Sequence, residues 1–400
     1  MLVLSLWICS VVFNVWNSYG ADLNSVEKQE PKLIAQGAVL IDGETGRTLW
    51  GKNEDTILPM ASTTKVMTCI LALENSDLNG EVHVSAYAAS MPDVQLNIKE
   101  GESYRMEDLL YSLMLESHND SAVAIAEHVA GSVKEFADLM NRKARDIGCS
   151  NTYFVTPNGL DGTDEENGKI HGTTAKELAQ IMRYCIRQSP LKEEFLKITG
   201  APSHTFSNLQ KTRSFSCINH NALLNTMDGA ISGKTGFTNL AGYCYVGAVE
   251  KNDKLFISAL LACGWPPHKT YKWQDMNKLI NYGAETFEYR EIKMETCVLQ
   301  EIPVHNGIKN VVPVEVRYPP DDEIRVLMGK DEPVTIKKKM ARFLEAPVEA
   351  GIPVGCLEYY VSDTCIASFP IVTTETIDLW NLEFCVKLLL KKLLFCYNAL

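Results

Sequence analysis

Three short polar motifs are the parts of this chain best suited to chemistry. In chain order they are Ser62-Thr63-Thr64-Lys65, Ser117-His118-Asn119 and Lys234-Thr235-Gly236. A serine hydroxyl is a weak nucleophile at neutral pH unless a neighbouring base takes its proton. Because residues three apart share one face of a helix, the amine of Lys65 can act as that base for Ser62. The first motif therefore predicts a serine that is acylated by its substrate.

The first two motifs are expected at helix boundaries. Residues 62–73 contain neither glycine nor proline, which predicts a helix that begins near Ser62. The unpaired N–H groups of a helix start would then surround the nucleophile. Apolar residues recur at helical spacing in 107–114 and 120–130, so Ser117-His118-Asn119 is expected on the loop between two helices.

The third motif is expected on a strand. Three consecutive runs have strand composition, and a hairpin signal at residues 42–46 predicts two more strands near the N-terminus. One helix is expected from a capping box at Thr174 and Glu177 to about residue 188, and another over 275–287. The three strand-like runs are 229–236, 242–250 and 254–263.

The composition argues against some classes of partner. The chain has 400 residues, of which 46% are hydrophobic and 22% charged, and its formal net charge is -12. Lysine and arginine do not cluster outside the extreme C-terminus, so a nucleic-acid partner is not expected. The 8 histidines show no metal-ligand spacing, so neither a metal ion nor an organic cofactor is expected. Four cysteines lie in apolar patterns and are expected to be buried free thiols, with a disulfide or a reactive thiol as the alternative. They are Cys69, Cys185, Cys244 and Cys263.

Residues 1–20 have the pattern of an export signal. An apolar run over 2–15 is followed by small residues at Ser18 and Gly20, which favour cleavage before Ala21. The run is shorter than the roughly 20 apolar residues that a membrane span needs. The basic residue usual before the apolar run is missing, so a retained anchor is the alternative interpretation.

After Arg290 the chain changes to short runs rich in valine and isoleucine, separated by prolines and glycines. Such spacing predicts a small all-β domain without a chemical motif of its own. The runs are 298–304, 311–316, 323–328, 334–341, 354–361 and 364–372.

The last segment, residues 379–397, is apolar but carries four charged residues. Glu383, Lys387 and Lys391 recur every four residues and would form one polar stripe on a helix. Each charge at a bilayer centre would cost roughly 2.5 to 3.5 kcal/mol, so an interfacial helix is expected in place of a membrane span. A helix packed against the protein itself is the alternative.

In the order S-x-x-K, S-x-N and K-T-G, the motifs resemble the set found in class A β-lactamases and penicillin-binding proteins. The chain most resembles the low-molecular-mass penicillin-binding proteins that act as D-alanyl-D-alanine carboxypeptidases. The likeness covers roughly residues 32–372 and extends beyond the three motifs. It includes Pro157-Asn158-Gly159-Leu160, Asn219-His220-Asn221, Asp228-Gly229, Gly233 to Thr238, and Ala241-Gly242-Tyr243.

The resemblance implies an α+β fold. A β-lactamase or transpeptidase-like domain, with an antiparallel sheet flanked by helices, would be followed by a small all-β domain and an amphipathic tail helix. The protein would be exported and held peripherally at the outer face of the cytoplasmic membrane, with the tail contacting the membrane surface. The expected domains are a signal peptide at 1–20, the catalytic domain at 21–290, the β-rich domain at 291–375 and the anchoring helix at 376–400.

The resemblance also implies a reaction. Ser62 would attack the carbonyl between the two terminal D-alanines of a peptidoglycan stem pentapeptide, form an acyl-enzyme and release D-alanine. β-Lactam antibiotics would acylate the same serine. Lys65 must be neutral for part of this cycle, whereas a free lysine has a pKa of about 10.4, so burial and a second cation such as Lys234 are needed to lower it.

The remaining motif residues receive roles from the same resemblance. Ser117 would relay a proton to the departing amine, and Asn119 would hold Lys65 and the peptide amide. Lys234 and Thr235 would bind the terminal carboxylate of the substrate. The backbone N–H groups of Ser62 and Phe237 would form the oxyanion hole. The expected substrate-binding set is therefore Lys234, Thr235, Gly236 and Phe237.

His118 stands where glycine or alanine is common in the family. The bulk of its side chain puts the width and the substrate preference of the cleft in doubt. Since no acid or metal partner is apparent from the sequence, a spectator role is expected.

Three rival interpretations fit the sequence less well, and the first of them, a P-loop, is rejected. A P-loop would need glycine where the chain has Asp228, and a helix after Lys234. A class A β-lactamase would need a deacylating glutamate in an E-x-x-L-N context, and the loop 164–167 lacks that leucine. A catalytically weak, penicillin-binding wall scaffold is disfavoured because all the motif residues are present.

Overall fold

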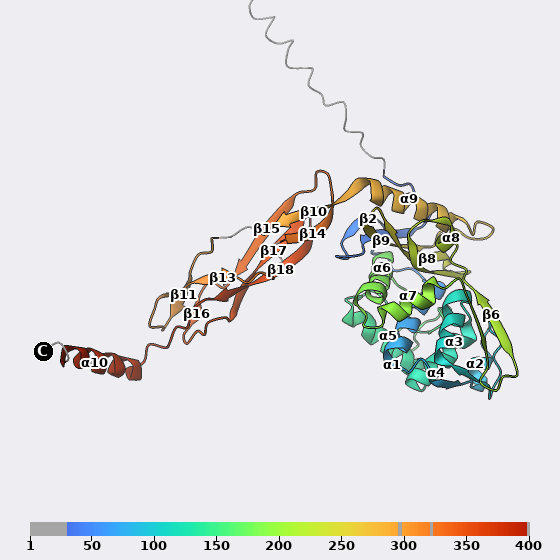
Figure 1. The fold of residues 1–400 in the computed structure, drawn as a ribbon, viewed down its shortest axis with the longest axis horizontal. Coiled ribbons are helices and arrows are strands. Elements are labelled where there is room, and N and C mark those ends of the chain that lie inside the picture. The colour runs from blue at the N-terminus through green and yellow to red at the C-terminus, as the bar shows by residue number, and fades with distance from the viewer. Residues whose placement is uncertain (1–29, 295–297, 321–322, 398–400) are drawn as a thin grey trace, which may run out of the picture. The chain divides into compact units, whose positions relative to one another are not determined.

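A computed structural model describes residues 30–294, 298–320 and 323–397 (Figure 1). For residues 391–397 the description is limited to the backbone. The predicted signal peptide at 1–20 lies outside the described residues.

A five-stranded antiparallel sheet forms the centre of the catalytic part, with strand order β2-β1-β9-β8-β7. The hairpin predicted at residues 42–46 joins β1 and β2, and Gly46 has a φ of 78° in that turn. The three strand-like runs are β7, β8 and β9, as predicted. The strands are β1 Gly37–Asp42, β2 Thr48–Lys52, β7 Ala230–Thr238, β8 Gly242–Lys251 and β9 Lys254–Leu261.

Both faces of the sheet are buried, because alternate side chains of a strand point to opposite faces. In β1, Val39 and Ile41 join one hydrophobic core, whereas Ala38 and Leu40 join the other. The first core packs against most of the helices, and the second packs against α9, on the opposite side of the sheet (Figure 1). The helices are α1 Lys65–Asn75, α3 Met106–Tyr111, α4 Asn119–Ala130, α5 Val133–Asp146, α6 Ala175–Arg183, α7 Lys192–Gly200 and α9 Tyr271–Thr286.

Smaller elements connect these layers. Two short hairpins, β3–β4 and β5–β6, pair antiparallel. Two π-helical segments, Ser112–Glu116 and Tyr184–Gln188, continue α3 and α6 and account for the longer helices predicted there. The remaining short elements are β3 Glu81–His83, α2 Ala86–Ala89, β4 Ser103–Arg105, β5 Ser203–Ser207, β6 Ser214–Ile218 and α8 Leu223–Thr226.

Two predicted helix starts differ from the structure in instructive ways. Ser62 lies in a 3-10 turn, Ala61–Thr64, and α1 begins only at Lys65. The predicted cap at Thr174 is confirmed, since its hydroxyl accepts from the N–H of Glu177 at 3.1 Å. The Glu177 carboxylate, however, accepts from Asn151 and Thr152 instead of closing a reciprocal capping box.

The C-terminal part is rich in β-structure, as predicted, and has its own apolar core around Ile302, Val354 and Ile371. Its sheets have the orders β10-β14, β12-β11-β16 and β13-β18-β17-β15. β10 was not predicted, because it follows α9 without a glycine or proline to separate them. The strands are β10 Phe287–Lys293, β11 Ile302–His305, β12 Val311–Val312, β13 Val314–Val316, β14 Glu323–Gly329, β15 Val334–Met340, β16 Leu344–Glu345, β17 Pro353–Val361 and β18 Thr364–Thr373.

The last described element is the helix α10, Leu382–Tyr397, as the amphipathic pattern predicts. Over the described residues, none of the helices is both long and apolar enough to cross a membrane. The four cysteines predicted to be buried free thiols are buried and free in the structure.

Candidate active site

The first motif brings its serine and lysine into direct contact. The Lys65 ammonium donates to Ser62 Oγ at 3.0 Å, to Asn119 Oδ1 at 2.8 Å and to the Asn158 carbonyl at 2.6 Å. Lys65 is fully buried, whereas Ser62 is partly exposed. A buried amine one turn from a reachable hydroxyl is suited to accept the proton of that hydroxyl.

A buried, neutral histidine stabilises the turn that carries Ser62. His171 Nδ1 accepts from the N–H of Val155 at 2.9 Å, which leaves Nε2 to donate to Thr64 Oγ1 at 2.8 Å. Thr64 Oγ1 in turn donates to the Ala61 carbonyl at 2.8 Å. Burial lowers the pKa of His171 to about 4, so the ring stays uncharged.

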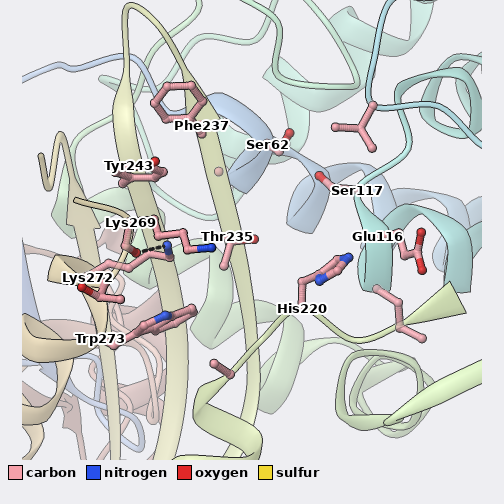
Figure 2. Close-up of a pocket in the computed structure, with 15 residues that line it drawn as sticks. Ser62, Glu116, Ser117, His220, Thr235, Phe237, Tyr243, Lys269, Lys272 and Trp273 are labelled. Atoms are coloured by element: carbon pink, nitrogen blue, oxygen red, sulfur yellow. Dashed lines mark hydrogen bonds between the residues drawn. The ribbon is translucent and has the colours of Figure 1, made fainter. Parts of the chain in front are cut away.

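Ser117 and His118 of the second motif lie in the break between the π-helical segment and α4, as predicted, whereas Asn119 is the first residue of α4. Ser117 has a φ of 71° and faces the groove near Ser62 (Figure 2). Its Oγ is buried and has no hydrogen-bond partner among the described residues. Asn119 is fixed by its amide group, which donates to the carbonyls of Pro92 and Asp93 at 3.1 and 3.0 Å and so turns Oδ1 towards Lys65.

The third motif lies on β7, beside the turn of Ser62. A Cβ on Gly236 would stand 2.9 Å from the backbone nitrogen of Ser62, so only glycine allows the strand to approach this closely. The strand continues to Thr238, which excludes the helix that a P-loop would require. Lys234 is buried, and its ammonium donates to the Thr235 carbonyl at 3.1 Å.

The two buried lysines influence each other. Burial, and then the charge of Lys234, hold the pKa of Lys65 well below its ordinary value, against a smaller opposing effect of Asp120. Burial lowers the pKa of Lys234 to about 7. The second cation expected from the sequence is therefore present, and burial is the larger of the two causes.

A groove of about 460 Å³ runs over these residues. It is lined by Ser62, Ser117, Thr235, Gly236 and Phe237, while Lys65, Asn119 and Lys234 lie beneath its surface. Figure 2 shows Thr235 and Phe237 on one wall of the groove and Ser117 on the other. The structure thus brings all eight predicted site residues together.

Sequence reasoning missed several residues at this groove. Lys272 of α9 lies against the aromatic rings of Tyr243 and Trp273, with its Nζ 4.8 and 4.6 Å from their centroids (Figure 2). Burial lowers the pKa of Lys272 to about 8. No motif marks this lysine, because α9 follows the third motif only after two further strands. The carbonyl of Asn158, which contacts Lys65, belongs to the segment 157–160. That segment was noted as part of the family resemblance but received no role.

The expectation for His118 needs a correction. The residue is buried instead of lying on an open loop, and it has an acid partner, with Nε2 3.3 Å from Glu116 Oε2. Its Nδ1 is 2.8 Å from Ser112 Oγ. His118 does not line the groove, so its bulk does not narrow the cleft.

The glutamates of the loop 164–167 do not line the groove that contains Ser62. Glu165 and Glu166 line a separate cavity of about 660 Å³, together with residues of α5. Glu166 pairs with Lys134 at 3.3 Å on the exposed surface. Neither glutamate lines the groove, so neither is placed to activate a deacylating water there as a class A β-lactamase requires.

Comparisons with known proteins cover both parts of the chain. Residues 24–263 match the family model of D-alanyl-D-alanine carboxypeptidases, peptidase S11, and residues 287–379 match that of the penicillin-binding protein 5 C-terminal domain. The chain is 28% identical over 349 residues to the D-alanyl-D-alanine carboxypeptidase DacF of Bacillus subtilis, covering 85% of each. It is 30% identical over 352 residues to DacA of Haemophilus influenzae, covering 84% of each.

Solved structures agree with these matches. Penicillin-binding protein 5 from Haemophilus influenzae is similar with a TM-score of 0.67 and 26% identity, covering 88% of this chain and 99% of that chain. Penicillin-binding protein D2 from Listeria monocytogenes, in its ampicillin-bound form, is similar with a TM-score of 0.54 and 28% identity, covering 64% of this chain and 98% of the other.

Proposed function

Because the chain belongs to the peptidase S11 family of serine-type D-Ala-D-Ala carboxypeptidases, we propose that it removes the terminal D-alanine from peptidoglycan stem pentapeptides through an acyl-enzyme on Ser62. One observation carries the proposal. The Lys65 amine lies 3.0 Å from Ser62 Oγ, in surroundings that lower the pKa of that amine. The pair therefore combines a nucleophile with an amine whose surroundings favour its neutral, proton-accepting form.

The acylation step uses the groups around the groove. Lys65 takes the proton of Ser62 while Oγ forms a bond to the carbonyl carbon between the two D-alanines. The oxyanion is stabilised by the backbone N–H groups of Ser62 and Phe237, which the close approach of β7 at Gly236 supports. The C–N bond then breaks, and the departing amine of D-alanine receives its proton through the hydroxyl of Ser117.

Deacylation restores the enzyme. A water molecule attacks the ester carbonyl, Lys65 takes a proton from that water, and the bond to Ser62 Oγ breaks as the oxygen is reprotonated. The shortened peptide leaves with a new carboxylate. Asn119 holds the amine of Lys65 in position through both half-reactions, since its own amide is fixed by two backbone carbonyls.

Recognition of the peptide end depends on positive charge beside β7. Thr235 faces the groove, and the Lys234 ammonium lies directly beneath it. Lys272 adds a second cation at the same end of the groove. A terminal carboxylate would interact with these groups, which would favour a free peptide end over an internal bond.

We further propose that β-lactams acylate Ser62 and are released slowly. A β-lactam presents a strained amide and a carboxylate to the same groups, and neither Glu165 nor Glu166 lines the groove to speed hydrolysis. A rapid β-lactamase reaction is therefore not expected.

The domain organisation proposed with this function is a signal peptide at 1–20, the catalytic domain at 21–290, a β-rich domain at 291–375 and a tail at 376–400. The helix α10 within that tail would lie on the membrane surface, whereas Ile377 packs in the β-rich core. The ranges of the two family matches support the division between the catalytic and β-rich parts. The enzyme would then work outside the cytoplasm, at the outer face of the cytoplasmic membrane.

The test is D-alanine release from a pentapeptide ending in D-Ala-D-Ala, measured with and without penicillin. We expect release by the wild-type enzyme, its loss in Ser62→Ala, and a penicillin adduct on the intact wild-type protein by mass spectrometry. Release that persists in Ser62→Ala would contradict the nucleophile. An unmodified protein that rapidly destroys penicillin would instead support a β-lactamase, and penicillin binding without D-alanine release would support a wall scaffold.

A further inference from the structure

Three side chains with metal-ligand chemistry converge behind the loop of the second motif. Glu116 and His118 flank Ser117, and Cys217 comes from β6. Their ligand atoms all lie within 4.8 Å of one another, and His118 Nε2 is 3.3 Å from Glu116 Oε2. Two ligands on one tetrahedral zinc ion, bound at about 2.0–2.3 Å, are separated by roughly 3.3–3.8 Å. The imidazole nitrogen and the carboxylate oxygen are therefore already about as far apart as two ligands of one zinc ion.

Neighbouring groups hold two of these ligands in a suitable orientation. Ser112 Oγ lies 2.8 Å from His118 Nδ1, and Ser121 Oγ lies 2.7 Å from Ser112 Oγ. Glu116 Oε1 accepts from the backbone N–H of Ile218 at 2.8 Å. The atoms that remain, Nε2 and Oε2, face each other. Hydrogen bonds to the far side of a histidine or a carboxylate are the usual support of metal ligands.

The cluster is enclosed but has an entrance. Cys217 is buried, and the side chains of His118 and Glu116 are 5% and 25% exposed. Glu116 also lines the groove (Figure 2), so an ion can reach the cluster from that side.

We propose that Glu116, His118 and Cys217 form a site for a zinc-like divalent ion. One sulfur, one imidazole nitrogen and one carboxylate oxygen suit zinc, whereas magnesium and calcium prefer oxygen ligands alone. The site lies outside the proposed reaction, which needs no metal. Local spacing did not indicate it, because β6 is distant in sequence from the second motif and reaches it only through the fold.

Occupancy of this site would tie the loop of Ser117 to the β5–β6 hairpin. The two metal ligands on the loop are the residues on either side of Ser117, and the third belongs to the hairpin. At present one hydrogen bond, from Ile218 to Glu116, makes that connection directly at the cluster. The ion would therefore stabilise the loop and raise the melting temperature of the enzyme.

The test uses Co²⁺ as a spectroscopic substitute for Zn²⁺, with the protein kept reduced. We expect one equivalent of Co²⁺ to produce thiolate-to-cobalt charge-transfer absorption, Zn²⁺ to displace it, and Mg²⁺ to leave it unchanged. We also expect Zn²⁺ to raise the melting temperature. These measurements do not depend on D-alanine release. They therefore test the metal site separately from the proposed function.

Two variants locate the site, and one controls for other cysteines. Cys217→Ser and His118→Ala should each lose the absorption and the thermal shift. Cys149→Ser removes another buried thiol, whose Sγ donates to the Glu177 carbonyl at 3.6 Å, and should retain both. Circular dichroism verifies the fold of each variant, and His118→Ala decides the question if Cys217→Ser does not fold. Absence of the band in the wild type, or its survival in a folded Cys217→Ser or His118→Ala, would overturn the proposal.

Discussion

Two buried lysines within one small site are the main electrostatic feature at the residue scale. A lysine normally carries its charge up to a pKa of about 10.4, and burial without an acid partner makes that charge costly. Lys65 has amide and carbonyl acceptors, and no carboxylate among the described residues is hydrogen-bonded to its amine. The site therefore favours a neutral base at Lys65, and Lys234 is the cation whose charge helps to keep it neutral.

These shifts predict a bell-shaped pH profile for kcat/KM. A general base must be unprotonated, so activity is lost as pH falls through the lowered pKa of Lys65. A cation that binds a carboxylate must be protonated, so activity is also lost as pH rises through the pKa of Lys234, about 7, and that of Lys272, about 8. Steady-state D-alanine release across pH measures the profile. A rate that keeps rising towards pH 10 would contradict the lowered pKa of the base.

Lys272 provides a second prediction at this scale. Lys272→Met should weaken capture of the substrate carboxylate and lower kcat/KM by roughly 10- to 100-fold, since a hydrogen bond to a charged group contributes about 1.5–3 kcal/mol. The effect should fall mainly on KM and on the second-order rate of penicillin acylation. Lys251→Met is a matched control, because Lys251 is bonded to Asn281 on the exposed surface of the same domain. An equal loss in both variants would contradict the assignment.

At the residue scale, the sequence predicted the catalytic residues that belong to short motifs, because their roles follow from their spacing along the chain. Ser62 and Lys65 are three residues apart, and all three motifs meet at one groove. Lys272 and the Asn158 carbonyl were missed, because neither belongs to a motif and their positions depend on how α9 and the loop 157–160 pack. The predicted environment of His118 was wrong for a related reason. Its burial depends on contacts with Ser112 and Glu116, which spacing in the sequence does not reveal.

At the scale of elements, the nucleophile depends on a close contact between a loop and a turn. Gly159 has a φ of 85°, and a Cβ there would lie 2.1 Å from the Ala61 carbonyl oxygen. Its neighbour Asn158 supplies the carbonyl that contacts Lys65. The sequence predicted a helix from Ser62, and it did not predict the 3-10 turn, because that turn is shaped by His171 and by this loop.

Gly159→Ala should therefore displace the turn of Ser62. A misplacement of the order of 1 Å costs about 10²-fold in rate, and we expect a loss of that size in penicillin acylation. Gly168→Ala is the matched control, since Gly168 also has a positive φ, 70°, but nothing lies within 4 Å of its Cβ position. Both variants carry the strain of a left-handed alanine, roughly 1–2 kcal/mol, and Gly159→Ala should lose further stability because its Cβ also meets the backbone of Ala61. Similar acylation rates in the two variants would contradict the role of the contact.

At the scale of the whole molecule, the proposed reaction and the proposed membrane contact belong to different parts of the chain. Short runs rich in valine and isoleucine, separated by prolines and glycines, allowed the β-rich part to be predicted, and the amphipathic period of the tail allowed α10 to be predicted. The boundaries between these parts were harder to predict from the sequence, because β10 follows α9 without a break. Ile377 is fully buried in the C-terminal core and bonds to Val348, although it follows the last predicted strand-like run. A deletion that tests the tail must therefore begin beyond it.

Removal of residues 382–400 should release the mature enzyme from membranes while leaving D-alanine release unchanged. The helix α10 exposes apolar side chains, with Leu382 81% and Leu389 61% exposed, and Glu383 pairs with Lys387 on its polar stripe. Such a helix is suited to the interface of a bilayer, where its apolar face is buried. Flotation with anionic lipid vesicles measures the binding. A substitution of Leu389 and Leu390 by serine in the full chain should weaken it likewise, and undiminished flotation of the truncated mature protein would place the membrane contact elsewhere.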